Sequence, residues 1–332
     1  MRALAWHRDC LYASRGYELL RTPVGSGEIC WESVGRWQPE WWRQITSRTR
    51  LGFRLVRDGF HALAVLDSGT LIGAVPGAIV TLATGEREFV RSYRVLRGTR
   101  PLHIITTPEE RLYWGEYFDN AERDEVHIYG SADGGASWQV AYTFPKGRIR
   151  HVHNLVYDGR LSCIWVFTGD YGEECRVLRA TLDFAKVEVV LSGNQQARAV
   201  AALPAPDGLY FSTDTPLEQN FVYRLDREAA LAKVAPLSGS SIYGCAVRDA
   251  LFFSTMVEPS NTNPDQNVRI YGSRSGDRWE SLLSWEKDFW PMRFFQYGNA
   301  FLPDGVNHST FLALTTIAVA GADQTLHLFR VE

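Results

Sequence analysis

Two histidines separated by a single residue, His151 and His153, are the side chains in this sequence best suited to chemistry. Residues two apart in a strand share a face, so both imidazoles can point into one site. A histidine beside a tyrosine such as Tyr117 and an arginine provides the groups for β-elimination of a uronate, because the arginine neutralises the carboxylate while base and acid move protons. The pair is equally compatible with ligand binding or with hydrogen bonds to buried backbone.

The same histidines raise the question of a metal. His103 is expected at the place equivalent to His153 in the preceding repeat, and the trio with His151 would need a carboxylate such as Asp170 or Glu116 as a further ligand. No CxxC pair or other cysteine zinc pattern is present. We therefore expect neither a metal nor another cofactor, and keep the metal site as the alternative.

Arginine recurs where the innermost strands of successive repeats are expected to begin, at Arg50, Arg100, Arg150, Arg198 and Arg293. Guanidinium groups near one axis repel one another unless they are paired, and their planar fork suits carboxylate, sulfate or phosphate. The pattern predicts an anionic ligand. The alternative is that each arginine is neutralised by an acid from a loop of the neighbouring repeat.

Four segments rich in carboxylates, amides and tyrosines are expected to form loops on the same face: 114–120, 168–174, 212–220 and 256–267. Glycoside hydrolysis needs two carboxyl groups, about 5.5 Å apart for retention and about 6.5 to 9.5 Å apart for inversion. The candidates are Glu116, Asp170, Glu173, Asp214 and Glu258, with no pair singled out. Trp114, beside Glu116, is the one tryptophan expected to stack on a sugar.

These residues need a scaffold, and the sequence predicts one made of repeated strands. Short β-rich runs recur between Gly, Asp, Asn and Pro, and helical periodicity is scarce, with 226–234 ambiguous. Val126–Ser131 and Val268–Ser273 nearly match, at a separation of three repeats of about 47 residues. Seven such marks predict an all-β propeller of seven four-stranded blades over residues 1–332 as one domain. Six blades are the alternative, because the first interval is long and the last blade is short of a strand unless an N-terminal strand completes it.

The segment Ser131–Trp138 resembles an Asp-box, the S-x-D-x-G-x-[ST]-W hairpin of bacterial-neuraminidase-type (BNR) repeats in sialidase-like β-propellers, and Ser273–Trp279 resembles a degenerate copy. In that family the boxes sit on the face opposite the active site. The resemblance therefore places the histidines and carboxylate-rich loops at the other face. Sialidases bind their substrate carboxylate with three arginines, and Phe53–Val56 resembles their [FY]-R-I-P segment without its proline. Tyr297 with Glu258 is a conceivable counterpart of the family's tyrosine and glutamate.

The resemblance and the arginines together imply a carbohydrate-active protein for an acidic, uronate-containing glycan, either a glycoside hydrolase or a lyase. The alternative is a propeller that binds a glycan or a protein without catalysis; for a protein partner, 37–43 is either an exposed patch or an insertion capping a blade. The predicted catalytic residues are His151, His153, Glu116, Asp170 and Tyr117. The predicted substrate-binding residues are Arg100, Arg150, Arg198, Arg293, His103, Asp214 and Trp114.

Composition narrows the remaining classes. The net charge of −3 argues against nucleic acid as a partner, and no run of about 20 apolar residues predicts a membrane span. The N-terminus lacks the apolar stretch of a secretory signal, and five widely spaced cysteines indicate reduced thiols. We expect a cytoplasmic monomer.

Overall fold

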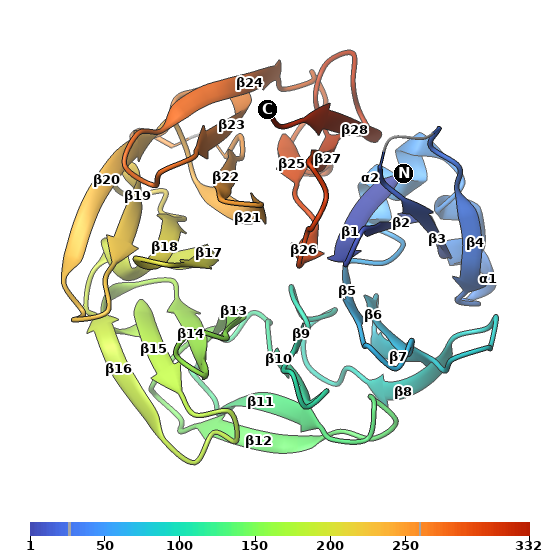
Figure 1. Cartoon of the computed structure of the whole chain (residues 1–332), viewed down its shortest axis with the longest axis horizontal. Helices are drawn as coiled ribbons and strands as arrows, with labels where there is room; N and C mark the ends of the chain where they lie inside the picture. Colours follow the sequence, from blue (N-terminus) through green and yellow to red (C-terminus); the bar gives the residue numbers. More distant parts are fainter. Residues whose placement is uncertain (26–27, 259) are drawn as a thin grey trace.

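Seven sheets stand around one axis in the computed structural model, which describes residues 1–25, 28–258 and 260–332 (Figure 1). The first four sheets follow the chain in order. Their strands are β1 Arg2–His7, β2 Cys10–Arg15, β3 Glu18–Pro23 and β4 Glu32–Arg36; β5 Ala62–Val65, β6 Leu71–Val75, β7 Ala78–Leu82 and β8 Val90–Arg94; β9 Ile105–Thr106, β10 Leu112–Gly115, β11 Val126–Ser131 and β12 Gln139–Phe144; β13 His151–Asp158, β14 Cys163–Gly169, β15 Arg176–Ala180 and β16 Val187–Ser192.

The last three sheets complete the circle. They contain β17 Ala199–Ala205, β18 Gly208–Thr213, β19 Asn220–Leu225 and β20 Leu231–Leu237; β21 Ser241–Val247, β22 Ala250–Thr255, β23 Asn267–Ser273 and β24 Glu280–Glu286; β25 Asn299–Phe301, β27 Phe311–Ile317 and β28 Thr325–Arg330. The protein is a seven-bladed β-propeller, as the repeats predict, and the six-bladed alternative is wrong. The ambiguous segment 226–234 is a turn followed by the start of β20.

The ends of the chain meet at a seam between the first and seventh blades. No N-terminal strand completes the three-stranded last blade; instead the two-residue strand β26, Asp304–Gly305, crosses over and pairs in parallel with Ala5 and Trp6 of β1. The amide of Ala3 also donates to Thr315 Oγ1 of β27 at 2.9 Å. The seam therefore rests on few backbone hydrogen bonds compared with the full ladders inside each blade.

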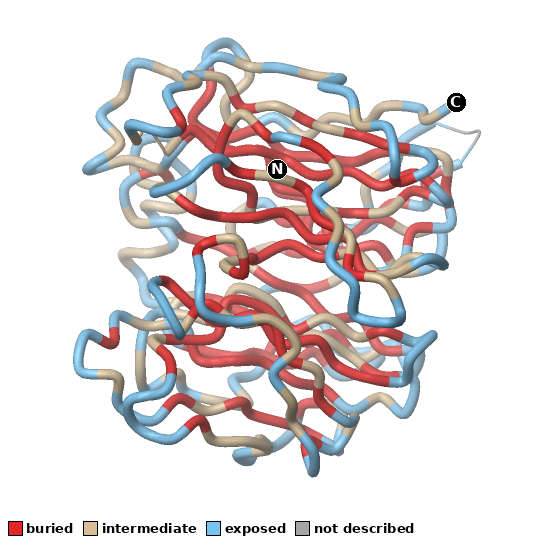
Figure 2. The backbone as a smooth tube through the Cα atoms, turned by 90° about the vertical axis from the view of Figure 1, so that its left-hand side faces the viewer, coloured by how far each residue is buried: buried red, intermediate tan, exposed pale blue. Residues whose placement is uncertain are grey.

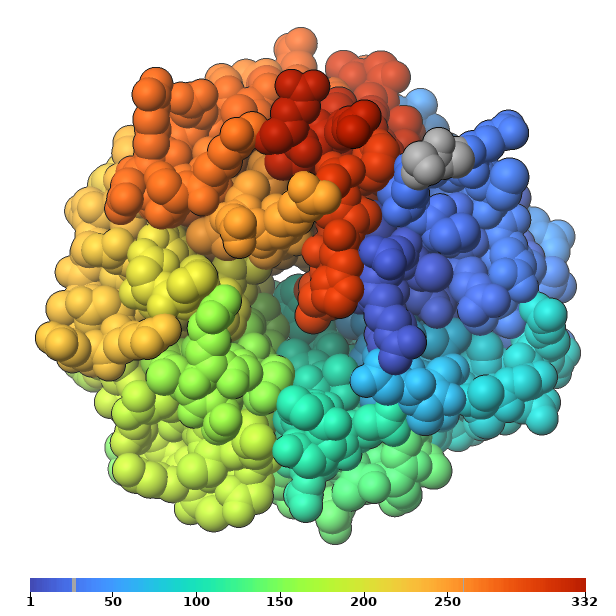
Figure 3. All heavy atoms as spheres, viewed as in Figure 1, coloured from blue at the N-terminus to red at the C-terminus, as the bar shows by residue number. Residues whose placement is uncertain are grey.

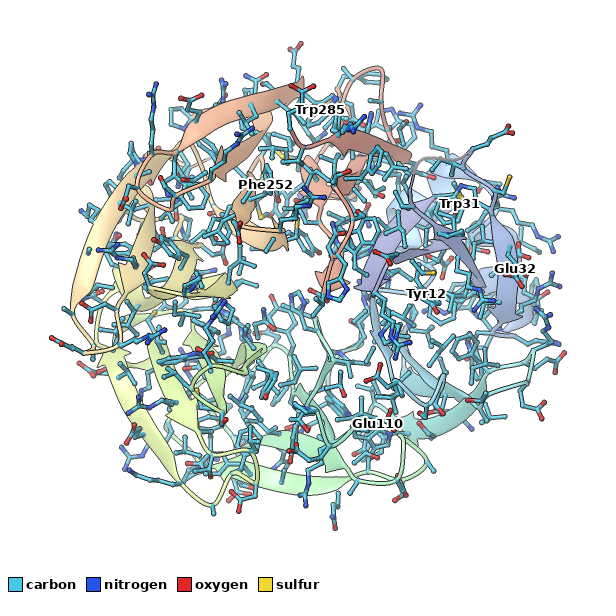
Figure 4. All side chains as sticks on the ribbon, in the orientation of Figure 1. Tyr12, Trp31, Glu32, Glu110, Phe252 and Trp285 are labelled. Atoms are coloured by element: carbon cyan, nitrogen blue, oxygen red, sulfur yellow. The ribbon has the colours of Figure 1, made fainter. Side chains whose placement is uncertain are left out.

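The hydrophobic core lies between neighbouring blades. All residues of β5, β6 and β7 are buried, whereas the outer strands β8 and β24 are largely exposed. Figure 2 shows this as buried backbone through the middle of the sheets with exposed loops at both ends. In Figure 4, Tyr12 and Phe252 lie on inner strands within the ring, and Glu32 lies at its rim. Burial of such apolar faces is the main stabilising term of a propeller.

A helical insertion explains the long first interval. Helices α1, Trp41–Thr46, and α2, Arg50–Val56, separate β4 from β5, and Thr49 caps α2 by accepting from the Gly52 amide at 3.1 Å. The interpretation of Arg50 as the start of an innermost strand is therefore wrong. Arg54 of α2 is completely buried and pairs with Asp288 and Asp323 near the last blade, at 2.7 and 3.2 Å. Its guanidinium fastens the insertion to the seventh blade.

The Asp-box turn has the local structure that its residues predict. It joins β11 to β12, with Gly134 and Gly135 at positive φ. Asp133 Oδ1 accepts from the Ser137 amide at 3.0 Å, and the Ser137 hydroxyl donates to Oδ2 at 2.6 Å. These bonds lower the pKa of Asp133 to about 2. Trp138 packs in the core between the second and third blades and donates to Ser92 at 3.2 Å.

Replacing Asp133 by alanine should destabilise the protein by about 1 kcal/mol at pH 7, the usual net worth of such hydrogen bonds in an exposed turn. Because the pKa of Asp133 is lower in the folded chain, this contribution is present above the unfolded pKa of about 4 and disappears as the pH falls towards 2. Urea unfolding at pH 7 and pH 3 measures it. Asp277→Ala, in the second turn, is the control and should cost less; equal losses would contradict the role of the Asp133 carboxylate.

No helix in the described residues is long and apolar enough to cross a membrane. The five cysteines are all free thiols in the described structure, two of them, Cys10 and Cys30, being partly or fully exposed.

Candidate ligand site on the propeller axis

The innermost strands of all seven blades begin around one axial cavity of about 320 Å³. Figure 3 shows a narrow opening at the centre of the ring. Because strands alternate in direction within a blade, the starts of the innermost strands lie at the end opposite the turn that joins β11 to β12. The predicted placement of His151 and Asp133 at opposite ends is thus confirmed. The four carboxylate-rich segments fall at the connections between second and third strands, with residue 259 lying outside the described residues.

One wall of the cavity carries three guanidinium groups, which we call the arginine cluster: Arg2, Arg57 and Arg100. No ion pair joins any of them to a carboxylate within the described part of the chain. Arg2 is buried, bonds to the ring Nδ1 and the carbonyl of His61 at 2.9 and 3.2 Å, and lies over the Phe301 ring. Burial, together with the charges of Arg2 and Arg57, lowers the pKa of Arg100 to about 9. Such a cluster attracts an anion.

The opposite wall carries carboxyl groups. Burial, followed by the nearby carboxylates Glu258 and Asp170, raises the pKa of Asp214 to about 7, although Arg198 opposes the shift. Burial also raises the pKa of Glu258, which lines the same cavity. Like charges in a buried site do not all ionise together, so this wall retains a proton near neutral pH.

Beside this wall, three side chains converge in what we call the His–His–Asp cluster. His151 Nε2 lies 3.1 Å from His153 Nε2, and Asp170 Oδ1 lies 3.5 and 3.2 Å from them. All three residues are buried. Although burial acts to raise it, the adjoining imidazoles of His151 and His153 hold the pKa of Asp170 well below its usual range. The Tyr117 ring lies against His151 with centroids 4.3 Å apart.

Acids from loops neutralise two of the predicted arginines. This was the alternative to an anionic ligand in the sequence analysis. Arg150 pairs with Asp119 and with Asp170 Oδ2, the latter at 3.2 Å. Arg198 Nη2 lies 3.4 Å from both Asp170 Oδ1 and Asp214 Oδ2. One guanidinium therefore bridges two carboxylates. Asp170 Oδ1 and Asp214 Oδ2 are at most twice 3.4 Å apart.

The structure places four predicted site residues away from both the axial cavity and the His–His–Asp cluster. Glu116 is buried but pairs with Arg97 and accepts from the His127 amide. His103 pairs with Asp304 at 3.0 Å and lines a second cavity, farther along the axis, instead of joining the other histidines.

The other two have plain physical reasons for lying elsewhere. Trp114 is only 1% exposed and stacks on Tyr129 between blades, so it offers no face to a sugar. Arg293 is exposed in the loop before β25 and is absent from the cavity wall. Arg54, in the segment that resembles the sialidase motif, is taken up by its two buried aspartates.

Sequence reasoning missed Arg2 and Arg57. Arg57 precedes β5 in the second blade, at the place given to Arg50, whereas Arg2 opens the first blade, where no arginine was predicted. Arg2 opens β1, and its signal was the apolar run that follows it at the N-terminus. Arg57 ends α2 in a left-handed conformation, at φ 57°, and directs the chain into the second blade. Tyr297 and Glu258, paired by the sialidase resemblance, both line the cavity.

No model of a known protein family matches the sequence, and no curated protein matches it either. Solved structures do. A chain of a mitotic checkpoint complex is 12% identical at a TM-score of 0.59, covering 99% of this chain and 89% of that one. The WD40 propeller domain of Doa1 is 8% identical at 0.56, covering 100% and 93%, and the computationally designed Ika8 protein is 6% identical at 0.53, covering 99% and 96%. At these identities the comparisons support the propeller fold alone.

Proposed function

We propose that the protein is a carbohydrate-active propeller that takes an acidic glycan into the axial cavity. The observation that carries the proposal is the contrast between the two walls. The arginine cluster offers positive charge with no carboxylate partner in the described residues, and the facing wall offers carboxyl groups that hold a proton. The volume of about 320 Å³ is within the range of small-molecule sites. A sugar carboxylate on the arginines leaves the glycosidic oxygen to the carboxyl wall.

The chemistry that suits this wall is hydrolysis. A general acid works best with a pKa near the working pH, and Asp214 has a pKa of about 7. Asp214 is therefore proposed as the proton donor to the leaving oxygen. Glu258 is the second carboxyl group, as nucleophile or as base for water. Elimination would instead release an unsaturated product, which absorbs ultraviolet light.

Calorimetry with uronate oligosaccharides and matched neutral oligosaccharides tests the binding step. Arg100→Ala should weaken binding of the acidic ligand by about 10- to 100-fold, the range of a lost charge-assisted hydrogen bond, and leave neutral ligands unaffected. Because Arg100 is held beside two other cations, the variant should unfold no more easily than the parent.

Arg293→Ala is the matched control, since that arginine is exposed and outside the cavity wall, and its binding should equal that of the parent. Unchanged acidic-glycan affinity in Arg100→Ala, or an equal loss in Arg293→Ala, would contradict the proposed site. An unsaturated product from the parent chain would replace hydrolysis by elimination while retaining the binding site.

A further inference from the structure

The His–His–Asp cluster has a hydrogen-bonding pattern that its own atoms leave incomplete. His151 Nδ1 lies 3.0 Å from the carbonyl oxygen of Phe118, and His153 Nδ1 lies 3.1 Å from that of Ala199. A carbonyl oxygen only accepts, so each Nδ1 carries the ring proton and donates it. In the neutral rings both Nε2 atoms then present lone pairs.

Three acceptors therefore face one another in a buried space. The two Nε2 atoms are 3.1 Å apart, and Asp170 Oδ1 is 3.2 and 3.5 Å from them. Three lone pairs at these distances repel unless a cation lies between them. The arrangement calls for a positively charged occupant.

The dimensions fit a metal ion. Zinc binds histidine nitrogen and carboxylate oxygen at about 2.0 to 2.2 Å, and the edge of such a tetrahedron is about 3.3 to 3.6 Å. The three separations of 3.1, 3.2 and 3.5 Å lie close to that edge. The outer contacts also fit, because metal-binding histidines usually donate their other N–H to a carbonyl or carboxylate. Arg150 holds the second oxygen of Asp170 at 3.2 Å, which fixes the orientation of the carboxylate.

We propose that His151, His153 and Asp170 form a binding site for one divalent transition metal of the zinc class. Two imidazoles and one carboxylate favour zinc over magnesium or calcium, which prefer oxygen ligands alone. His153 also lines the axial cavity, so the ion lies at the edge of the candidate ligand site. The proposal differs from the sequence-based expectation of no metal. It keeps His151, His153 and Asp170 of the alternative metal site and leaves out the separated His103. It does not rest on the proposed glycan.

Zinc added alone to the chelator-treated full chain tests the site. Calorimetry should show one equivalent bound per chain, with magnesium giving no comparable signal. His153→Ala should lower zinc affinity about 100-fold or more, beyond the 10- to 100-fold loss typical of an outer contact. His103→Ala, at another histidine that pairs with an aspartate, is the control and should bind zinc as the parent does.

Cobalt added to the parent chain gives a readout that needs no variant. Tetrahedral nitrogen and oxygen ligation should produce visible absorption that one equivalent of zinc removes. No stoichiometric zinc binding, no cobalt absorption, or zinc binding that survives His153→Ala in the folded state would each overturn the proposal and would mean that a shared proton occupies the cluster. None of these results bears on glycan binding, which is measured without added metal.

Discussion

Asp214→Asn should reduce kcat for acidic-glycan cleavage by about 10²- to 10⁴-fold, the usual contribution of a general acid. The amide keeps the size of the protonated carboxyl group but has no acidic proton to give. In the parent, activity should fall as the pH rises through about 7, because the required proton is lost from Asp214. Initial rates across pH 5 to 9, with product analysis, measure both effects.

The same substitution should leave the fold intact. The pKa of Asp214 is raised in the folded chain, so its titration lowers the stability of the parent between the unfolded pKa of about 4 and about 7, and the full cost is present above pH 7. The asparagine variant avoids that cost and should be at least as resistant to urea at pH 8. Asp119→Asn, at an exposed aspartate that pairs with Arg150, serves as the control with near-parent activity. Full cleavage by Asp214→Asn would rule out Asp214 as the proton donor.

Arg54→Ala should destabilise the protein by about 3 to 5 kcal/mol, the range for removing one partner of a buried ion pair. The guanidinium is completely buried, and its loss leaves Asp288 and Asp323 without their shared cation. Lys287 beside Asp288 and the largely exposed Arg50 beside Asp323 offset the two charges only in part. Urea unfolding at pH 7 measures the change in the free energy of unfolding.

Arg50→Ala is the matched comparison, because Arg50 also pairs with Asp323 but is largely exposed, and it should cost less than about 1 kcal/mol. A second comparison adds Asp323→Asn to Arg54→Ala, which should recover part of the loss, because Asp288 keeps the buried Lys287 whereas Asp323 keeps only the exposed Arg50. Similar costs for Arg54→Ala and Arg50→Ala would show that the insertion is not held through Arg54.

The fold was accessible from the sequence because a propeller repeats one local pattern. The near-identical strands Val126–Ser131 and Val268–Ser273 occupy the same third position in their blades, and the Asp-box marked which end of the molecule to exclude. The histidine pair and Asp170 followed from that choice. Their separation of two residues in one strand is preserved, although a bulge follows Val152.

The rest of the site depends on contacts that no local pattern encodes. Whether an arginine is available to a ligand depends on which acid reaches it across a blade boundary. Arg150 and Arg198 are taken by such acids, whereas Arg100 meets other cations. The helical insertion was not expected from the sequence. The start of the second blade's inner strand was therefore expected at Arg50, whereas Arg57 stands before that strand. Trp114 was misjudged because a loop boundary one residue away decides between burial and exposure.

The seam between the first and last blades runs along the wall of the axial cavity. The seven blades follow one another around the axis, and the first and last blades meet through β26, the hydrogen bond from Ala3 to Thr315 and an apolar cluster that includes Trp6 and Ala313. Arg2 belongs to the first blade, Asn299 and Phe301 belong to the last, and all three line the cavity. A ligand that contacts both blades would bind only while they are together. Its binding free energy would therefore add to the free energy needed to separate the first and last blades. Ligand binding in the cavity and closure of the propeller are then thermodynamically linked.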